Sequence, residues 1–286
     1  MVAVGLFNIN NFVCSHPENL VRVAKVAEEA GYDSVWTGEH VVLPDPQVPP
    51  SPVAPEGRML DPAVALTFAA AHTSRVKLGT GIIILPQRNP LVLAKELASV
   101  DVLSGGRVIF GVGVGYLKPE FDALGVSMDD RGTRTLEYIE AMRAIWAGDK
   151  ASYQGTYVSF DGVSANPKPT QAGGPPVVMG GHTPAAWRKA VTHCQGWYGF
   201  ALDVDQVAKN VAGLRKAAER YERPAELGEL EITVTPRGRI DVESVQRFGE
   251  AGVDRLVLTG PRGTADDVEA LVAFVEQVGT EVIAKL

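Results

Sequence analysis

Short runs of aliphatic and β-branched residues alternate along the chain with longer stretches of helical periodicity. The run from Val2 to Phe7 is typical of a strand, and the stretch after it carries apolar residues at Leu20, Val23, Ala24 and Ala27. Steps of three and four residues place such side chains on one face of a helix. Repeated succession of strand and helix predicts parallel strands joined by crossover helices.

This pattern predicts eight strands, at residues 2–7, 34–37, 76–84, 107–112, 176–179, 196–200, 231–235 and 255–258. A helical stretch follows each of them. Eight such units in 286 residues are typical of a (β/α)8 TIM barrel, the α/β fold that we predict. A doubly wound open sheet is the alternative, and it is weaker because no G-x-G-x-x-G motif follows the first strand.

Two segments interrupt the alternation. The proline-rich stretch from Leu43 to Pro55 is incompatible with a helix or a central strand, so we expect a long loop. The stretch from Tyr153 to Pro169 resembles a small hairpin. We therefore predict a single domain over residues 1–286 with an insertion at about 150–175.

Composition narrows the classes of partner. The chain has 27 lysine and arginine residues against 34 aspartate and glutamate residues, a net charge of −7, and no run of five basic residues. We expect neither nucleic acid nor a membrane as a partner, since the longest aliphatic run ends at Pro86 after four residues. Cys14 and Cys194 lack metal-ligand spacing, and we expect no metal site. Without a signal-like N-terminus, a cytoplasmic location is the expectation.

The active site of a TIM barrel lies at the carboxyl ends of its strands, so a histidine that follows a strand is a candidate site residue and one that precedes a strand is not. His16, His40 and His182 follow predicted strands, whereas His72 and His193 precede them. His40 directly follows Glu39 at the end of the second strand, where an imidazole can move a proton. The alternative for His40 is a residue that only caps a loop.

Glycines mark three further strand ends. Gly180 and Gly181 lead straight into a helix, which favours either a phosphate-binding turn or a tight turn without a ligand. The run from Gly111 to Tyr116 is expected to leave room for a flat ring, and Gly81 indicates a bulge or a close approach to a ligand. Arg88 is a candidate clamp for an anion or else a surface residue. No nucleophile or metal motif appears, so an organic cofactor has to supply redox or other demanding chemistry.

Several motifs together resemble one family. They are AGYDSVWTGEH (30–40), LGTG (78–81), PQRNP (86–90), LSGGRV (103–108), GVGVGY (111–116), RGTRTLEYIEAMR (131–143), NPKP (166–169) and GGHTPAA (180–186). As an ordered set they resemble the luciferase-like monooxygenase superfamily, and within it the oxidoreductases that use the deazaflavin coenzyme F420.

The resemblance implies a (β/α)8 barrel that transfers a hydride between F420 and a small organic substrate, and the loops suggest an apolar one. His40 matches the family's histidine beside the redox ring. The cofactor-binding residues that it implies are Glu39, Thr80, Gly81, Ile82, Val112, Gly113, Tyr116, Gly180, Gly181 and His182. Tyr116 stands where sugar-phosphate dehydrogenases of the superfamily carry a glutamate, which argues against sugar-phosphate oxidation.

Other functions stay open at this stage. An FMN-dependent monooxygenase of the same superfamily would use reduced flavin from a partner reductase and O2. A protein that binds F420 without catalysis is a second alternative. An aldolase is disfavoured because Lys118 lies too far beyond its strand. The family also leads us to expect a homodimer.

Overall fold

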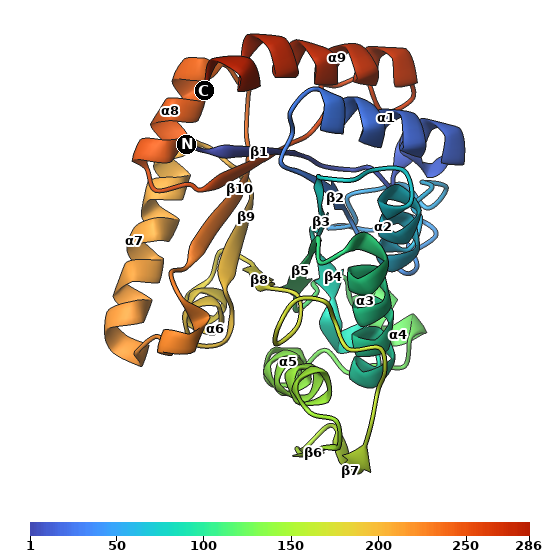
Figure 1. Ribbon diagram of the computed structural model, residues 1–286, viewed down its shortest axis with the longest axis vertical. Helices are drawn as coiled ribbons and strands as arrows, with labels where there is room; N and C mark the ends of the chain where they lie inside the picture. The colour runs from blue at the N-terminus through green and yellow to red at the C-terminus, as the bar shows by residue number, and fades with distance from the viewer.

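Eight parallel strand positions close into a barrel in the computed structural model, which describes all 286 residues (Figure 1). The strands are β1 (Ala3–Leu6), β2 (Ser34–Thr37), β3 (Lys77–Thr80) continued by β4 (Ile83–Ile84), β5 (Val108–Gly113), β8 (Val177–Gly180), β9 (Gly196–Leu202), β10 (Glu231–Pro236) and β11 (Arg255–Leu258). β1 pairs with both β2 and β11, and β3 pairs with β5, so no edge is left open. The predicted TIM barrel is confirmed.

Helices cover the outside of the barrel. They are α1 (Pro17–Glu29), α2 (Pro62–Ala70), α3 (Pro90–Ser104), α4 (Lys118–Ala123), α5 (Arg131–Ala147), α6 (Pro184–His193), α7 (Val204–Tyr221), α8 (Val242–Glu250) and α9 (Val268–Glu281). Proline in the first turn starts α1, α2, α3 and α6, where its missing N–H would have no helical partner. No helix is both long and apolar enough to cross a bilayer.

The third predicted strand is not continuous. It stops at Thr80 and resumes at Ile83, and the peptide bond between Gly81 and Ile82 is cis. Neighbouring glycines accommodate this bulge: a Cβ atom at Gly111 would lie 1.8 Å from the Thr80 carbonyl oxygen, and one at Gly113 would lie 1.8 Å from Ile82 Cδ1. At Gly111 and Gly113 the bulge fills the room that we expected for a ligand ring, whereas Gly115 and Tyr116 of the same run line the cavity at this end of the barrel.

The insertion after α5 contains the predicted hairpin. Strands β6 (Ala151–Gln154) and β7 (Ser159–Val163) pair antiparallel, and they lie outside the barrel (Figure 1). One element was not predicted. Residues 118–123, for which the pattern predicts neither helix nor strand, form the short helix α4.

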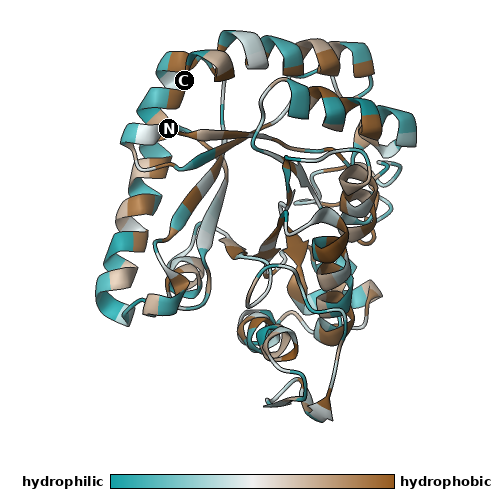
Figure 2. Cartoon of the chain, viewed as in Figure 1, coloured by the Kyte–Doolittle hydropathy of each residue, from teal (hydrophilic) through white to brown (hydrophobic).

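Two apolar clusters stabilise the fold. A cluster of 55 buried residues packs the strands against the helices, and a smaller one fills the barrel interior around Trp36, Tyr198 and Val257. The outer helices differ in their exposed faces (Figure 2). α1 and α7 present hydrophilic residues outward, whereas α2 and α3 are hydrophobic over most of their length.

Candidate active site

A cavity of about 390 Å³ opens at the carboxyl ends of the strands, where a TIM barrel carries its active site. Its volume suits a ligand the size of a cofactor ring with a small substrate. Eight of the predicted site residues line it: Glu39, His40, Gly81, Ile82, Tyr116, Gly180, Gly181 and His182. The sequence therefore located eight of the 20 residues that line the cavity.

Three predicted residues lie outside this lining. Thr80 is fully buried and its hydroxyl donates to the Gly111 carbonyl at 2.7 Å, within the sheet. Val112 belongs to the main apolar core, and Gly113 packs against the Ile82 side chain. They support the floor of the cavity from behind, and direct contact with a cofactor stays a prediction for each.

His40 is held between two polar side chains at the cavity wall. Its Nδ1 lies 3.1 Å from Oε2 of Glu120, and its Nε2 lies 3.2 Å from the hydroxyl of Tyr116. The other Glu120 oxygen accepts the Val41 N–H at 2.6 Å. Because a carboxylate only accepts, the neutral imidazole carries its proton on Nδ1 and keeps the Nε2 lone pair on the side of the cavity.

Burial fixes this arrangement. The side chains of His40 and Glu120 are 7% and 0% exposed. Partial burial and the Glu120 charge raise the pKa of Tyr116, so its hydroxyl keeps its proton near neutral pH and can donate to His40. Nε2 can then accept or release a proton once the Tyr116 hydroxyl turns its own hydrogen away.

Glu120 was missed by the sequence analysis. It lies on α4, eighty residues after His40, in a stretch without a recognised motif. A glutamate two residues into a six-residue helix gives no local signal of a histidine partner. Only the closing of β2 and β5 onto the same barrel end brings the two together.

The loop that carries His40 is anchored from two sides. Asn10 donates to the carbonyl oxygens of Gly38 and Leu60 at 2.9 and 2.6 Å, and its side-chain oxygen accepts the Gly38 N–H. The His40 N–H lies 3.1 Å from the Met59 sulfur. Residues 58–60 of the long loop therefore close over the site and order the strand end.

Glu39 points its carboxylate into the protein. It accepts the Ile84 N–H and hydrogen bonds from Arg88, whose guanidinium also contacts Asp61 Oδ2 at 2.6 Å. Burial raises the pKa of Glu39, and the Arg88 charge opposes this shift without cancelling it. Arg88 is occupied by two carboxylates, so the expected anion clamp is wrong. Glu39 instead ties the bulged strand to the His40 loop.

The glycine turn before α6 offers unpaired donors. Gly181, at a φ of +123°, uses its N–H for the Tyr198 carbonyl. The N–H groups of His182, Thr183 and Ala185 find no acceptor within the chain. Backbone donors at the start of a helix favour a bound anion, as predicted for a phosphate.

Aromatic side chains form the remaining wall. Phe7 and Phe200 pack with ring centroids 5.6 Å apart, and the Tyr198 hydroxyl lies 2.5 Å from Thr235 Oγ1. His182 accepts the Phe200 N–H at 3.0 Å, and desolvation lowers the pKa of its imidazole. These residues make an apolar surface between His40 and the glycine turn.

Comparison with known proteins agrees with this geometry. Residues 10–243 match the family model described as luciferase-like monooxygenase. The chain belongs to this family. Uncharacterized protein Rv0953c of Mycobacterium tuberculosis is 32% identical over 259 residues, which cover 87% of this chain and 89% of the relative.

Two solved structures share the fold of this luciferase-like chain. Monooxygenase RslO1 from Streptomyces bottropensis superposes with a TM-score of 0.76 at 23% identity, covering 99% of both chains. Coenzyme F420-dependent tetrahydromethanopterin reductase from Methanopyrus kandleri superposes with a TM-score of 0.76 at 20% identity, covering 99% of this chain and 98% of the reductase. A monooxygenase and an F420-dependent reductase therefore share this fold.

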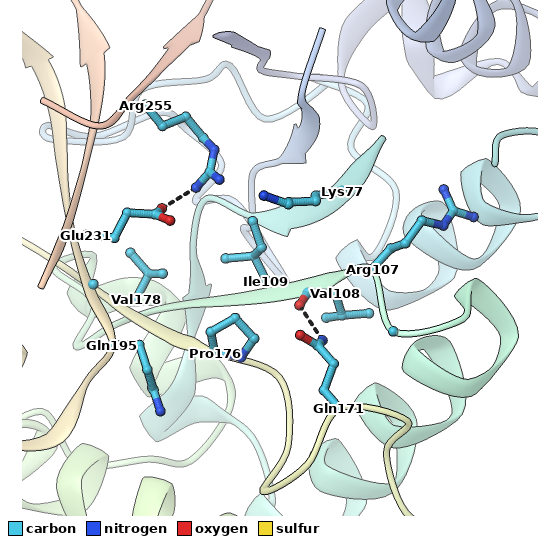
Figure 3. A pocket seen from close by; sticks show the side chains of 12 residues that line it. Lys77, Arg107, Val108, Ile109, Gln171, Pro176, Val178, Gln195, Glu231 and Arg255 are labelled. Carbon is cyan, nitrogen blue, oxygen red and sulfur yellow. Dashed lines mark hydrogen bonds and ion pairs between the residues drawn. The ribbon is translucent and has the colours of Figure 1, made fainter. Parts of the chain in front are cut away.

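The opposite end of the luciferase-like barrel holds a second cavity, of about 240 Å³ (Figure 3). Arg255, at the start of β11, contacts Glu231 there and donates to Asp33 at 2.9 Å. Arg107 donates to backbone carbonyls, including that of Val76 at 2.9 Å. Charged groups that satisfy one another at the amino ends of the strands are typical of a stabilising role.

Proposed function

We propose that this chain is an F420-dependent oxidoreductase that transfers a hydride between the deazaflavin and a small, apolar organic substrate. The observation that carries the proposal is the imidazole of His40, oriented by buried Glu120 and directed at a cavity floored by Gly81 and Ile82. Hydride transfer between an alcohol and a carbonyl moves one proton as well. His40 Nε2 is the group that accepts or returns that proton.

The residues present fit the coenzyme. Unpaired N–H groups before α6 would hold a phosphate, and the surface of Ile82, Phe7 and Phe200 would hold a flat ring. When bound, F420 supplies the hydride acceptor or donor. The protein binds and orients both partners, excludes water with the loop at residues 52–59, and handles the proton at His40.

Equilibrium binding separates the proposal from its alternatives. F420 and FMN are titrated side by side into the purified protein, with absorbance and fluorescence as readouts. We expect F420 to bind at micromolar concentration or tighter and FMN much more weakly. Turnover is then sought with a panel of apolar alcohols and ketones. Binding without turnover on any substrate would leave a non-catalytic F420-binding protein.

A flavin-dependent monooxygenase is the second candidate, supported by the shared fold of RslO1. Such an enzyme would use reduced FMN, delivered by a separate reductase, together with O2. Tight FMN binding and substrate-dependent O2 uptake would favour it over the F420 enzyme.

We also infer that two copies of the chain associate through α2 and α3. Val64, Phe68, Val92, Val102 and Leu103 expose large apolar side chains on these helices, the hydrophobic pair in Figure 2. A patch of this kind on a water-facing surface is typical of a protein interface. Sedimentation equilibrium of the wild type and of Leu103→Glu tests this inference, with a dimer expected only for the wild type.

A further inference from the structure

Lys189 is a buried cation without a partner. It lies on α6, is only 7% exposed, and makes no hydrogen bond or ion pair with any other group of the chain. Most of the side chain is buried, while the amine at its end still reaches water. The fold therefore leaves one cationic donor between α6 and α5 without a partner from the chain.

The amine of Lys189 is aimed at the start of α5. Its Nζ lies 3.4 Å from the position that a Cβ atom of Gly132 would take, so this glycine lets the amine approach the backbone. The Gly132 N–H has no acceptor in the chain, and the side chain of Asp130 does not cap the helix. Unpaired donors from the backbone and from Lys189 meet at this point.

Arg131 adds a third donor and a second charge. Its Nε is buried and has no partner, while one of its terminal nitrogens donates to the Met128 carbonyl. Neither Arg131 nor Lys189 forms an ion pair. The adjacent carboxylate, Asp130, pairs with Arg134 at 2.7 Å.

The charges around Lys189 are of one sign. Desolvation and the nearby Arg188 and Arg131 lower its pKa. The remaining group that acts on it is Cys194, whose thiol stays neutral because burial raises its pKa to about 12. Two cationic side chains and an unpaired backbone N–H at the start of a 17-residue helix have the chemistry of an anion site.

We propose that Lys189, Arg131 and the Gly132 N–H form an oxyanion-binding cluster, the Lys189 cluster, for a phosphate or carboxylate group. Lys189 follows Thr183, the residue that caps α6, by six positions, or roughly 9 Å along the helix. The cluster is thus separate from the glycine turn and lies beside it. Its ligand is either free phosphate or, resting on the proposed function, the anionic side chain of F420 beyond its phosphate.

Inorganic phosphate is the first probe. It is titrated by calorimetry into the cofactor-free wild type, Lys189→Met and Lys209→Met at constant ionic strength. Methionine keeps the unbranched shape of the buried side chain, and Lys209 is an exposed lysine on α7. We expect phosphate affinity to fall about tenfold to a hundredfold in Lys189→Met, the loss of one charge-assisted hydrogen bond, and not to change in Lys209→Met.

Thermal unfolding gives a readout independent of activity. Phosphate should raise the melting temperature of the wild type by mass action, and should raise that of Lys189→Met less, because only the glycine turn before α6 is left to bind it. Without phosphate, Lys189→Met should melt at or above the wild-type temperature, because it removes a cation that Arg188 and Arg131 repel. If phosphate raised the melting temperature equally in both proteins, the proposal that the Lys189 cluster binds an oxyanion would be wrong.

F420 titrations separate the two sources of anion. If the cluster holds the coenzyme side chain, F420 affinity falls about tenfold or more in Lys189→Met, whereas FMN affinity does not change. If only the phosphate affinity falls, the ligand is free phosphate. If the wild-type protein does not bind F420, the proposed function is wrong. The phosphate titration still tests whether the Lys189 cluster binds an anion. Equal affinities of wild type and variant for both probes would refute it.

Discussion

Each end of the barrel places an arginine between two carboxylates, and the two ends differ in what surrounds that arginine. At the amino ends of the strands, Arg255 contacts Glu231 (Figure 3) and Asp33, and Lys77 pairs with the same aspartate. At the carboxyl ends, Arg88 contacts Glu39 and Asp61 beside a largely apolar cavity. The ion pairs fasten strands at both ends. The chemistry that we propose belongs to the end where an oriented imidazole faces a cavity.

Loss of the imidazole should have the largest effect. We expect His40→Ala to lower turnover about 10²- to 10⁴-fold, because it removes the group that moves the proton. We also expect the free energy of unfolding to fall by about 1–3 kcal/mol, because the variant leaves the buried Glu120 Oε2 without its partner. Steady-state F420 reduction, together with urea denaturation of the same preparation, measures both.

One result for His40→Ala would contradict the proposed role of the imidazole. Turnover within twofold of the wild type would exclude His40 as the proton-transfer group. Unchanged F420 affinity in the variant would show that the cofactor site itself is intact.

Arg255→Met tests the other end of the barrel. The Arg255 side chain is 4% exposed, and its removal leaves Glu231 without a counter-charge and Asp33 with Lys77 alone, at 3.3 Å. We expect a loss of about 3 kcal/mol in the free energy of unfolding, the low end for a buried pair because both carboxylates stay partly hydrated. F420 affinity should not change.

Arg262→Met is the matched control for Arg255→Met, since Arg262 is exposed and forms no ion pair. Its stability should stay within about 0.5 kcal/mol of the wild type. Similar losses in the two variants would mean that the Arg255 ion pairs contribute nothing specific to stability.

Glu120→Gln, at the carboxyl ends of the strands, should lower turnover less than His40→Ala does. The amide keeps the size of the carboxylate but loses the charge that fixes the His40 tautomer. We expect turnover to fall about ten- to a hundredfold, corresponding to one charge-assisted hydrogen bond. ¹⁵N chemical shifts of His40 should move away from the Nδ1–H tautomer.

Asp122→Asn, on the same helix, is the control for Glu120→Gln because Asp122 pairs only with Lys118 at the surface. It should change neither the tautomer nor turnover. A wild-type tautomer in Glu120→Gln would refute the orienting role.

The smallest expected effect is the pH dependence of stability that Glu28 contributes at the amino ends of the strands. Partial burial acts to raise the pKa of Glu28, but hydrogen bonds from Arg75, Val76 and Ser74 outweigh it and lower the pKa to about 2. The folded pKa lies below the unfolded value, so Glu28 stabilises the fold above about pH 4.5. This contribution is lost as the pH falls toward 2.

Glu28→Gln isolates that contribution. At pH 7 we expect a loss below about 1 kcal/mol, because solvent screens a largely hydrated carboxylate. The difference in melting temperature between variant and wild type should shrink between pH 4.5 and 2. A difference that is independent of pH would contradict the assignment.

The sequence predicted the barrel because every strand and most helices carry their own periodicity. It predicted the cavity wall at His40, Tyr116 and Gly180 because strand ends converge in this fold. It did not predict Glu120, whose relation to His40 depends on the packing of distant segments. It also misassigned Arg88, since nothing local shows that two carboxylates already occupy it.

Ile82 has a consequence for protein engineering. Its side chain occupies the space left by Gly113 and lies 3.3 Å from where a Cβ atom of Gly180 would stand. A side chain at Gly113 would collide with Ile82, and one at Gly180 would crowd it. Redesign for bulkier substrates therefore has to begin by shortening Ile82 itself, with Phe200, which also lines the cavity, as the next position to vary.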